Sequence, residues 1–344
     1  MRVHTTSRDL DPFALAPGSD LVLELDEAHG LDLPHGVLVD DHLSIEGRRA
    51  VDREALRALA EWRGLHDESL TVDGVCLPHL HEWALLAVLV RAGRAVAGLR
   101  RAIDRHHPPS VVVAGADAHT RAVAVAAAER SGVAVLAETD VTPSSSAAAR
   151  RPEPLGRRVR RGAIDLVTNL GVPSVLRRDS VVVVSYWPLT PLLDRMLDEG
   201  TSRPAVLLAK RPAGPSRILR TAARGGWVGL PSPRRVRRAA VSAADAFRAV
   251  AGGTARPLDL FGCSTGDFLH SRLLDLLRPR AGADLAAAAT LRRAFGRGRV
   301  TRVVGCSDVE GEARLVVTLA REAGIPVLLI AHGAYLLPQA LPDM

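Results

Sequence analysis

A histidine and a glycine, His332 and Gly333, follow a run of aliphatic residues that predicts a buried strand at 325–330. A histidine at the carboxyl end of a parallel strand faces the crevice where α/β proteins bind ligands, and a following glycine lets the backbone approach a phosphate closely. His332 is therefore a candidate general base for a hydroxyl group or a donor to a phosphate. The alternative is a hydrogen-bonded histidine at the edge of the core.

Two aspartates, Asp117 and Asp308, also follow predicted strands. A carboxylate at such a place can bind a sugar hydroxyl, but Asp is a common N-cap, and capping is the favoured interpretation for both residues. Lys210 and Arg211 come directly after a predicted strand at 205–209 and are placed to meet an anionic ligand. A solvated pair of cations is the equal alternative.

A different chemistry is suggested by the GxSxG stretch at 262–266. Ser264 would be the nucleophile of an α/β-hydrolase, since Asp308 and His332 follow it in the order of that class. Asp267 stands where helix packing wants a tiny residue, and no HGGG oxyanion element is found, so this hypothesis ranks low. His79, His81 and Glu82 are metal-ligand types, but no further ligands accompany them and a helix start is the better interpretation.

Predicted strands and helices alternate regularly from residue 110 onward, except in the segment 141–165, which has no apolar periodicity. Predicted strands lie at 110–114, 133–137, 180–185, 205–209, 227–230, 302–305 and 325–330. Predicted helices lie at 118–130, 189–198, 216–223, 234–250, 267–277, 285–295 and 310–322. This alternation predicts an α/β protein with doubly wound, Rossmann-like parallel sheets and helices on both faces.

The first hundred residues give weaker signals. Short apolar runs at 21–25, 37–39 and 43–45 predict brief strands, and Asp52 predicts the N-cap of a helix. A longer helix is expected at 80–106. We divide the chain into an N-terminal α/β subdomain at 1–140, a Pro/Ser/Arg-rich linker at 141–165 and a Rossmann-like domain at 166–344.

One internal similarity is visible. The segment that begins at Val111 resembles the segment that begins at Arg302, and both predict a strand, an acidic turn, a helix and a second strand. Duplication and the general likeness of βαβ units rich in Ala and Val are equal explanations.

The 344 residues are 47% hydrophobic and only 3% aromatic, which predicts a core of small and branched aliphatic side chains. No stretch reaches the about 18 apolar residues of a membrane span, and the N-terminus lacks the apolar region of a signal peptide. Cys76, Cys263 and Cys306 are far apart and form no CxxC pair. We expect a cytoplasmic protein that holds neither a metal nor a cofactor.

The net charge of +7 is the difference between 45 basic and 38 acidic residues, and only Lys210 among the basic residues is a lysine. Arginine clusters at 150–151, 157–161 and 234–238 lie beside Pro and Gly, as linker residues do. They lack the interleaved aromatic residues of a single-strand binder and the helical motif of a groove reader, so no specific nucleic-acid partner is expected. Contact with an anionic partner, such as a nucleotide, a glycan or the surface of a membrane, is the minority interpretation.

The most informative stretch runs from Gly305–Asp308 through a helix to GIPVLLIAHGAYLLPQ, which begins at Gly324. It resembles the N-terminal, acceptor-side domains of bacterial surface and capsular polysaccharide biosynthesis proteins of the GT-B glycosyltransferase type. A strand that ends near an acidic residue, a GIP turn, a buried strand and a His-Gly pair recur together in that family. Ala331 stands where the family often has Gln. The resemblance covers residues 180–340, and 83–137 more loosely.

The resemblance implies an enzyme that transfers a sugar from a nucleotide-activated donor to a glycan acceptor. His332 and Asp308 are then the catalytic candidates, and Gly333, Lys210 and Arg211 are the candidates for binding the nucleotide-sugar, which is a substrate. GT-B enzymes have two Rossmann-like domains, so we expect a donor-binding domain beyond residue 344 or on a partner chain. The second hypothesis is a non-catalytic binding or assembly module, and the third is the hydrolase.

Overall fold

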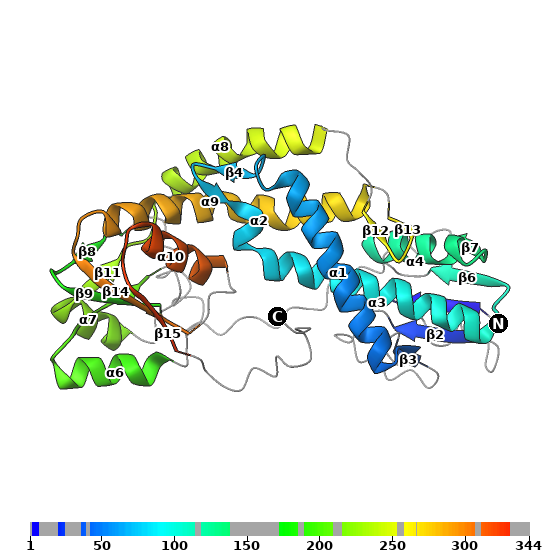
Figure 1. Ribbon diagram of the computed structural model, residues 1–344, viewed down its shortest axis with the longest axis horizontal. Coiled ribbons are helices and arrows are strands. Elements are labelled where there is room, and N and C mark those ends of the chain that lie inside the picture. Colours follow the sequence, from blue (N-terminus) through cyan, green and yellow to red (C-terminus); the bar gives the residue numbers. More distant parts are fainter. Residues whose placement is uncertain are drawn as a thin grey trace, which may run out of the picture. The chain divides into compact units, whose positions relative to one another are not determined.

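The computed structural model describes residues 2–6, 20–24, 36–38, 42–113, 118–137, 172–184, 189–208, 215–252, 258–265, 267–306 and 311–330 (Figure 1). The chain divides into two compact units. Unit 1 contains Met1–Leu65, Ala84–Arg151 and Ala251–Asp275, and unit 2 contains His66–Trp83, Pro152–Val250 and Leu276–Met344. The boundary between the two units after Arg151 falls within the linker predicted at 141–165, and this segment lies outside the described residues. Sequence patterns did not indicate the two exchanged segments, 66–83 and 251–275.

Unit 1 holds a sheet of five strands, all parallel, in the order β3-β2-β1-β6-β7. Its strands are β1 (Arg2–Thr6), β2 (Asp20–Glu24), β3 (Gly36–Leu38), β6 (Ser110–Val113) and β7 (Ala134–Ala137). Strands β2 and β3 follow one another on one side of β1, and β6 and β7 follow one another on its other side. The strands expected near 21, 37, 110 and 134 are confirmed, whereas β1 was not predicted.

The described helices of unit 1 are α1 (Ile45–His66), α3 (Glu82–His106) and α4 (Ala118–Arg130), together with the first turns of α9 (Phe268–Phe295), up to Asp275. Helices α1 and α3 pack closely, because a Cβ on Gly93 of α3 would lie 3.0 Å from Cγ1 of Val51 on α1. The strand expected at 43–45 and the N-cap expected at Asp52 are both wrong. Ser44 caps α1, since its Oγ accepts a hydrogen bond of 3.1 Å from the Gly47 amide, and Asp52 lies inside the helix.

Unit 2 holds a sheet of six strands in the order β15-β14-β9-β10-β11-β8 (green to red in Figure 1). Its strands are β8 (Val175–Leu176), β9 (Ser180–Val183), β10 (Arg203–Leu207), β11 (Gly226–Val228), β14 (Val300–Gly305) and β15 (Val327–Leu329). Only β8 is antiparallel to its neighbour. The chain again moves outward, from β9 to β11, and returns to the other side of β9 with β14 and β15. Unit 2 therefore repeats the strand order of unit 1.

The helices of unit 2 begin with the one-turn α2 (Leu77–Leu80), which follows the short hairpin of β4 (Thr71–Val72) and β5 (Val75–Cys76). The longer helices are α6 (Thr190–Glu199), α7 (Pro215–Arg224), α8 (Pro233–Gly252), α9 (Phe268–Phe295) and α10 (Gly311–Glu322). Side chains of neighbouring strand residues point to opposite faces. Val206 packs with Leu193 and Leu197 of α6, whereas Leu207 faces side chains of α9 and α10.

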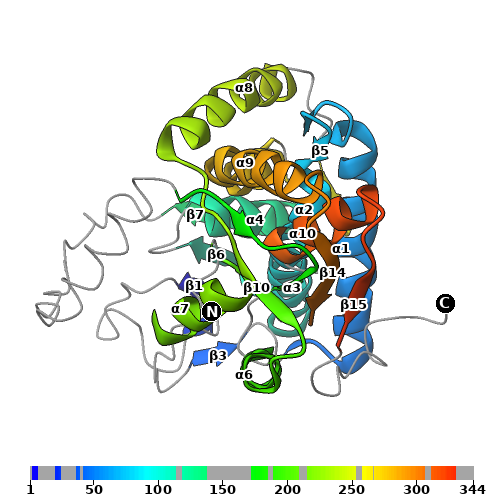
Figure 2. The same cartoon turned by 90° about the vertical axis from the view of Figure 1, so that its left-hand side faces the viewer.

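Helix α9 corrects one prediction. The sequence predicts two helices, 267–277 and 285–295, because Pro279 and Gly282 interrupt the pattern, but the structure has one continuous helix. Gly282 is required for packing, since a Cβ there would lie 2.7 Å from Cβ of Ala240 on α8 and 2.8 Å from the Val236 carbonyl oxygen. Helices α8 and α9 are neighbours in the view of Figure 2 as well.

The internal similarity lies at equivalent positions of the two sheets. Its first copy covers β6, α4 and β7, and its second copy covers β14, α10 and β15. In both sheets the two strands of the copy lie next to each other on the same side of the first parallel strand, which is β1 in unit 1 and β9 in unit 2. A generic likeness between βαβ units would not select the same position in both sheets. The shared position favours duplication.

Candidate functional site

All five candidate site residues, Asp308, His332, Gly333, Lys210 and Arg211, lie outside the described residues, as does Asp117. The strands that precede the five candidates are described. They are β14 for Asp308, β15 for His332 and Gly333, and β10 for Lys210 and Arg211. These strands run parallel in one sheet, so their carboxyl ends share one edge. Strands β14 and β15 are direct neighbours there, and β10 is separated from β14 by β9.

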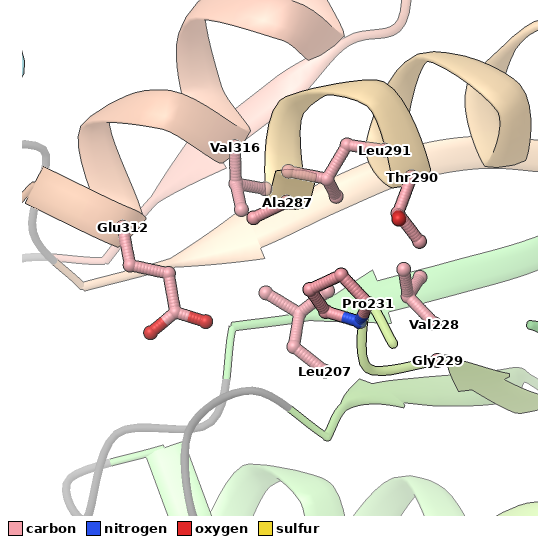
Figure 3. Close-up of a pocket in the computed structure, with 9 residues that line it drawn as sticks. All are labelled: Leu207, Val228, Gly229, Pro231, Ala287, Thr290, Leu291, Glu312 and Val316. Atoms are coloured by element: carbon pink, nitrogen blue, oxygen red, sulfur yellow. The ribbon is translucent and has the colours of Figure 1, made fainter. Parts of the chain in front are cut away.

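A small cavity lies at this edge between the sheet and two helices (Figure 3). It is lined by Leu207, Val228, Gly229, Pro231, Ala287, Thr290, Leu291, Glu312 and Val316. Its volume of about 20 Å³ has room for about one water and therefore none for a sugar. Glu312 is in the first turn of α10, where the helix dipole favours a negative charge. This cavity belongs to the packing of α9 and α10 on the sheet.

A larger cavity, of about 200 Å³, opens where β11 ends. It is lined by Val172, Pro173, Ser174, Leu230, Arg235, Thr290, Arg293, Ala294 and Arg297. Because β8 is antiparallel to β11, the residues before β8 lie beside the end of β11. The Val172 amide donates to the Leu230 carbonyl oxygen at 3.2 Å, and the Gly229 amide donates to Ser174 Oγ at 2.9 Å. We call this cavity the arginine pocket.

Sequence reasoning missed the arginine pocket. Arg235 lies in the first turn of α8, which confirms the helix predicted at 234–250 and shows that the interpretation of the cluster at 234–238 as linker charge is wrong. Arg293 and Arg297 come from the end of α9 and the turn after it. No spacing signal joins these three residues, because it is the packing of α8 on α9 that brings them together.

The hydrolase hypothesis is not supported by the position of Ser264. Cys263–Ser264 forms β13, which pairs antiparallel with β12 (Asp259–Leu260) in a two-stranded hairpin outside both parallel sheets. Phe261 and Gly262 have φ values of 54° and 70°, so Gly262 serves a hairpin turn and not a nucleophile elbow. Two contacts hold the turn: the Phe261 amide donates to Glu54 Oε1 at 2.9 Å, and Arg100 Nη1 donates to the Phe261 carbonyl oxygen at 3.2 Å.

The residues of the His79–Glu82 motif have structural partners. The His81 Nε2 lies 2.7 Å from Asp284 Oδ2, and both side chains are largely buried. Arg314 Nη1 donates to the His79 carbonyl oxygen and to Glu82 Oε2, each at 2.6 Å. Among the described residues, no three His, Cys, Asp or Glu side chains are grouped to hold a metal ion. The motif ties α2 and the start of α3 to the other helices of unit 2.

Comparisons of the chain with protein-family models, with curated proteins and with solved structures give no match. None of the helices in the described ranges combines the length and the hydrophobicity needed to cross a membrane.

Proposed function

We propose that the chain is a GT-B-like glycosyltransferase of surface or capsular polysaccharide synthesis. It would transfer a sugar from a nucleotide-activated donor to a glycan acceptor in the cytoplasm. The observation that carries the proposal is the strand order. Each sheet runs outward through three strands and returns with the fourth and fifth, which is the order of Rossmann-like nucleotide-binding units.

Two further features support the proposal. Val206 and Leu207 contact helices on opposite faces of the second sheet, as in a doubly wound fold. GT-B enzymes have two Rossmann-like domains, and each of the two units of this chain has a largely parallel sheet that is compatible with such a domain. The donor-binding domain that the resemblance implies, beyond residue 344 or on a partner chain, remains part of the proposal.

The candidate residues have separate roles in the proposed reaction. An acceptor hydroxyl oxygen forms a bond to the anomeric carbon of the donor sugar while the bond from that carbon to the diphosphate oxygen breaks. His332 takes the proton of the acceptor hydroxyl, and Asp308 holds a sugar hydroxyl. Lys210 and Arg211 stabilise the charge on the leaving diphosphate, which the backbone at Gly333 approaches closely.

The single lysine gives a direct test. An amine-reactive ester can acylate only Lys210 and the N-terminal amine of this sequence. We expect one member of a panel of uridine-, guanosine- and cytidine-activated sugars to slow acylation of Lys210 several-fold, measured by peptide mass spectrometry. The N-terminal amine of the same molecule is the control and should react at an unchanged rate.

A histidine variant then separates binding from catalysis. His332→Asn should retain the protection of Lys210 and abolish sugar transfer, whereas His107→Asn, at an exposed histidine of unit 1, should change neither. If no nucleotide-sugar alters the acylation of Lys210, the enzyme proposal is wrong. The alternative, a non-catalytic binding or assembly module with the same fold, would then account for the chain.

A further inference from the structure

We propose that the arginine pocket binds the phosphate or diphosphate group of a small anionic ligand. The pocket uses none of the residues assigned to sugar transfer, so the proposal goes beyond that function. Arg235, Arg293 and Arg297 line a cavity of about 200 Å³ at the carboxyl end of β11. Guanidinium groups donate several hydrogen bonds in a fixed plane and match phosphate oxygens in pairs.

Arg235, Arg293 and Arg297 line one cavity in which the described residues supply no neutralising acid. Within the described ranges no carboxylate forms an ion pair with any of them, and no Asp or Glu lines the cavity. In the part of the chain that the structure describes, Arg293 donates to two neutral acceptors, the Ala289 carbonyl oxygen at 3.0 Å and Thr290 Oγ1 at 3.2 Å. Partial burial lowers the pKa of Arg293, and the charges of Arg235 and Arg297 lower it further. A bound anion would relieve this repulsion.

Helix electrostatics does not explain the cluster. Arg293 is in the last turn of α9, where the helix dipole favours a cation. Arg235 is in the first turn of α8, where the dipole disfavours a cation and where no acidic residue is found. Arg297 lies beyond the end of α9. The position of Arg235 is therefore opposed by the dipole of its own helix, and helix electrostatics does not account for the whole cluster.

The shape of the site indicates the kind of ligand. The arginines surround a concave space, whereas a membrane surface or a nucleic-acid duplex requires an extended face. The other walls come from Val172, Pro173, Leu230 and Ala294, and they offer apolar surface to a sugar or a base next to the phosphate. The phosphate group can belong to a nucleotide or to a phosphorylated sugar.

Calorimetric titration of the full chain with pyrophosphate tests the proposal. Arg235→Gln, Arg293→Gln and Arg297→Gln should each weaken binding by about tenfold or more, since each removes a charge-assisted hydrogen bond. Arg237→Gln is the matched control: it removes the same charge from α8 at a position about 200° around the helix from Arg235. This variant should bind like the unaltered chain. Circular dichroism melting confirms that every variant is folded.

Three results would overturn the proposal: no binding of pyrophosphate, equal weakening in all four variants, or binding only to anionic lipid vesicles. Parallel titrations with a nucleoside diphosphate and a sugar 1-phosphate identify the source of the phosphate, because the ligand that also uses the apolar walls should bind more tightly than pyrophosphate. Pyrophosphate should still bind to the His332→Asn variant, whether or not nucleotide-sugars protect Lys210 from acylation. Such a result separates the arginine pocket from the site of the proposed sugar transfer.

Discussion

A hydrogen bond between two buried side chains joins α1 to α9 within unit 1. Trp62 Nε1 donates to His270 Nδ1 at 3.0 Å, and the exposed fractions of the two residues are 1% and 4%. An indole N–H can only donate, so this bond requires a lone pair on Nδ1 and places the histidine proton on Nε2. Burial lowers the pKa of His270. The core of unit 1 is therefore built for a neutral imidazole.

We expect the free energy of unfolding to fall as the pH drops below about 6.5, the ordinary pKa of histidine. Below about pH 6.5 the unfolded chain takes up a proton at His270 more readily than the folded chain, because the folded chain lowers the pKa of this residue. The stability that neutral His270 contributes is therefore fully present above about pH 6.5 and is lost as the pH falls below that value. Urea unfolding at pH 7.5 and pH 5.0 measures the difference. His270→Asn, which keeps a polar atom near the Nδ1 position, should reduce the loss.

His107→Asn is the matched control, because His107 is exposed and its φ of 45° suits Asn. It should leave the pH dependence unchanged. Equal pH dependence in the unaltered chain and in His270→Asn would show that this histidine does not titrate on unfolding.

Close backbone contact defines the edge of the second sheet at which β8 pairs with β11. A Cβ on Gly226 would lie 1.8 Å from the Val175 carbonyl oxygen, and one on Gly229 would lie 1.7 Å from the Val172 carbonyl oxygen. Gly226 also has a φ of 126°, which side chains disfavour. These glycines let β8 pair with β11 and bring residues 172–174 to the arginine pocket.

We expect Gly226→Ala to destabilise the protein by at least about 2 kcal/mol, because the methyl group meets backbone that cannot move aside cheaply. Gly64→Ala is the matched control in α1, where nothing lies within 4 Å of the new Cβ, and should stabilise by up to about 1 kcal/mol. Thermal and urea unfolding measure both. A neutral Gly226→Ala would contradict the tight pairing of β8 and β11.

Neither of the two units is a continuous stretch of chain. Residues 66–83 belong to unit 2, and they contribute the buried side chains of Leu70, Leu77 and Leu80. Residues 251–275 belong to unit 1 and include His270. Any division of the chain at one point therefore removes core residues from a unit.

We expect residues 152–344, expressed alone, to lack a cooperative unfolding transition because their core is incomplete. Residues 66–344 retain the exchanged segment and should keep more native structure in unit 2. Near-ultraviolet circular dichroism during melting compares the two fragments with the full chain. A cooperative transition in 152–344 that matches the full chain would contradict this view of unit 2.

Much of the secondary structure could be predicted from local patterns. Strands β9, β10 and β14 are aliphatic runs between turn residues, and helix α10 has a clear apolar face. The sequence predicts the start of α1 at Asp52, too late, because Gly47 and charged residues obscure the apolar pattern of its first turns. It predicts two helices in place of α9 because Pro279 and Gly282 are residues that usually end helices.

The arginine pocket and the exchanged segments could not be predicted, because both depend on contacts between residues far apart in the chain. The candidates at 308 and 332 stay predictions, since they lie outside the described residues. What the structure adds for them is the position of the strands that precede them.

The interleaving of the two units constrains how the protein can be made. Ribosomes extend a chain by about 5–20 residues per second, so residues 251–275 are synthesised about 6 to 28 s after the end of β7. Until then the five-stranded sheet of unit 1 lacks part of its own core, although all of its strands have already been synthesised. The nascent parallel strands would stay exposed during that interval, and we expect the chain to be a client of chaperones that act during translation.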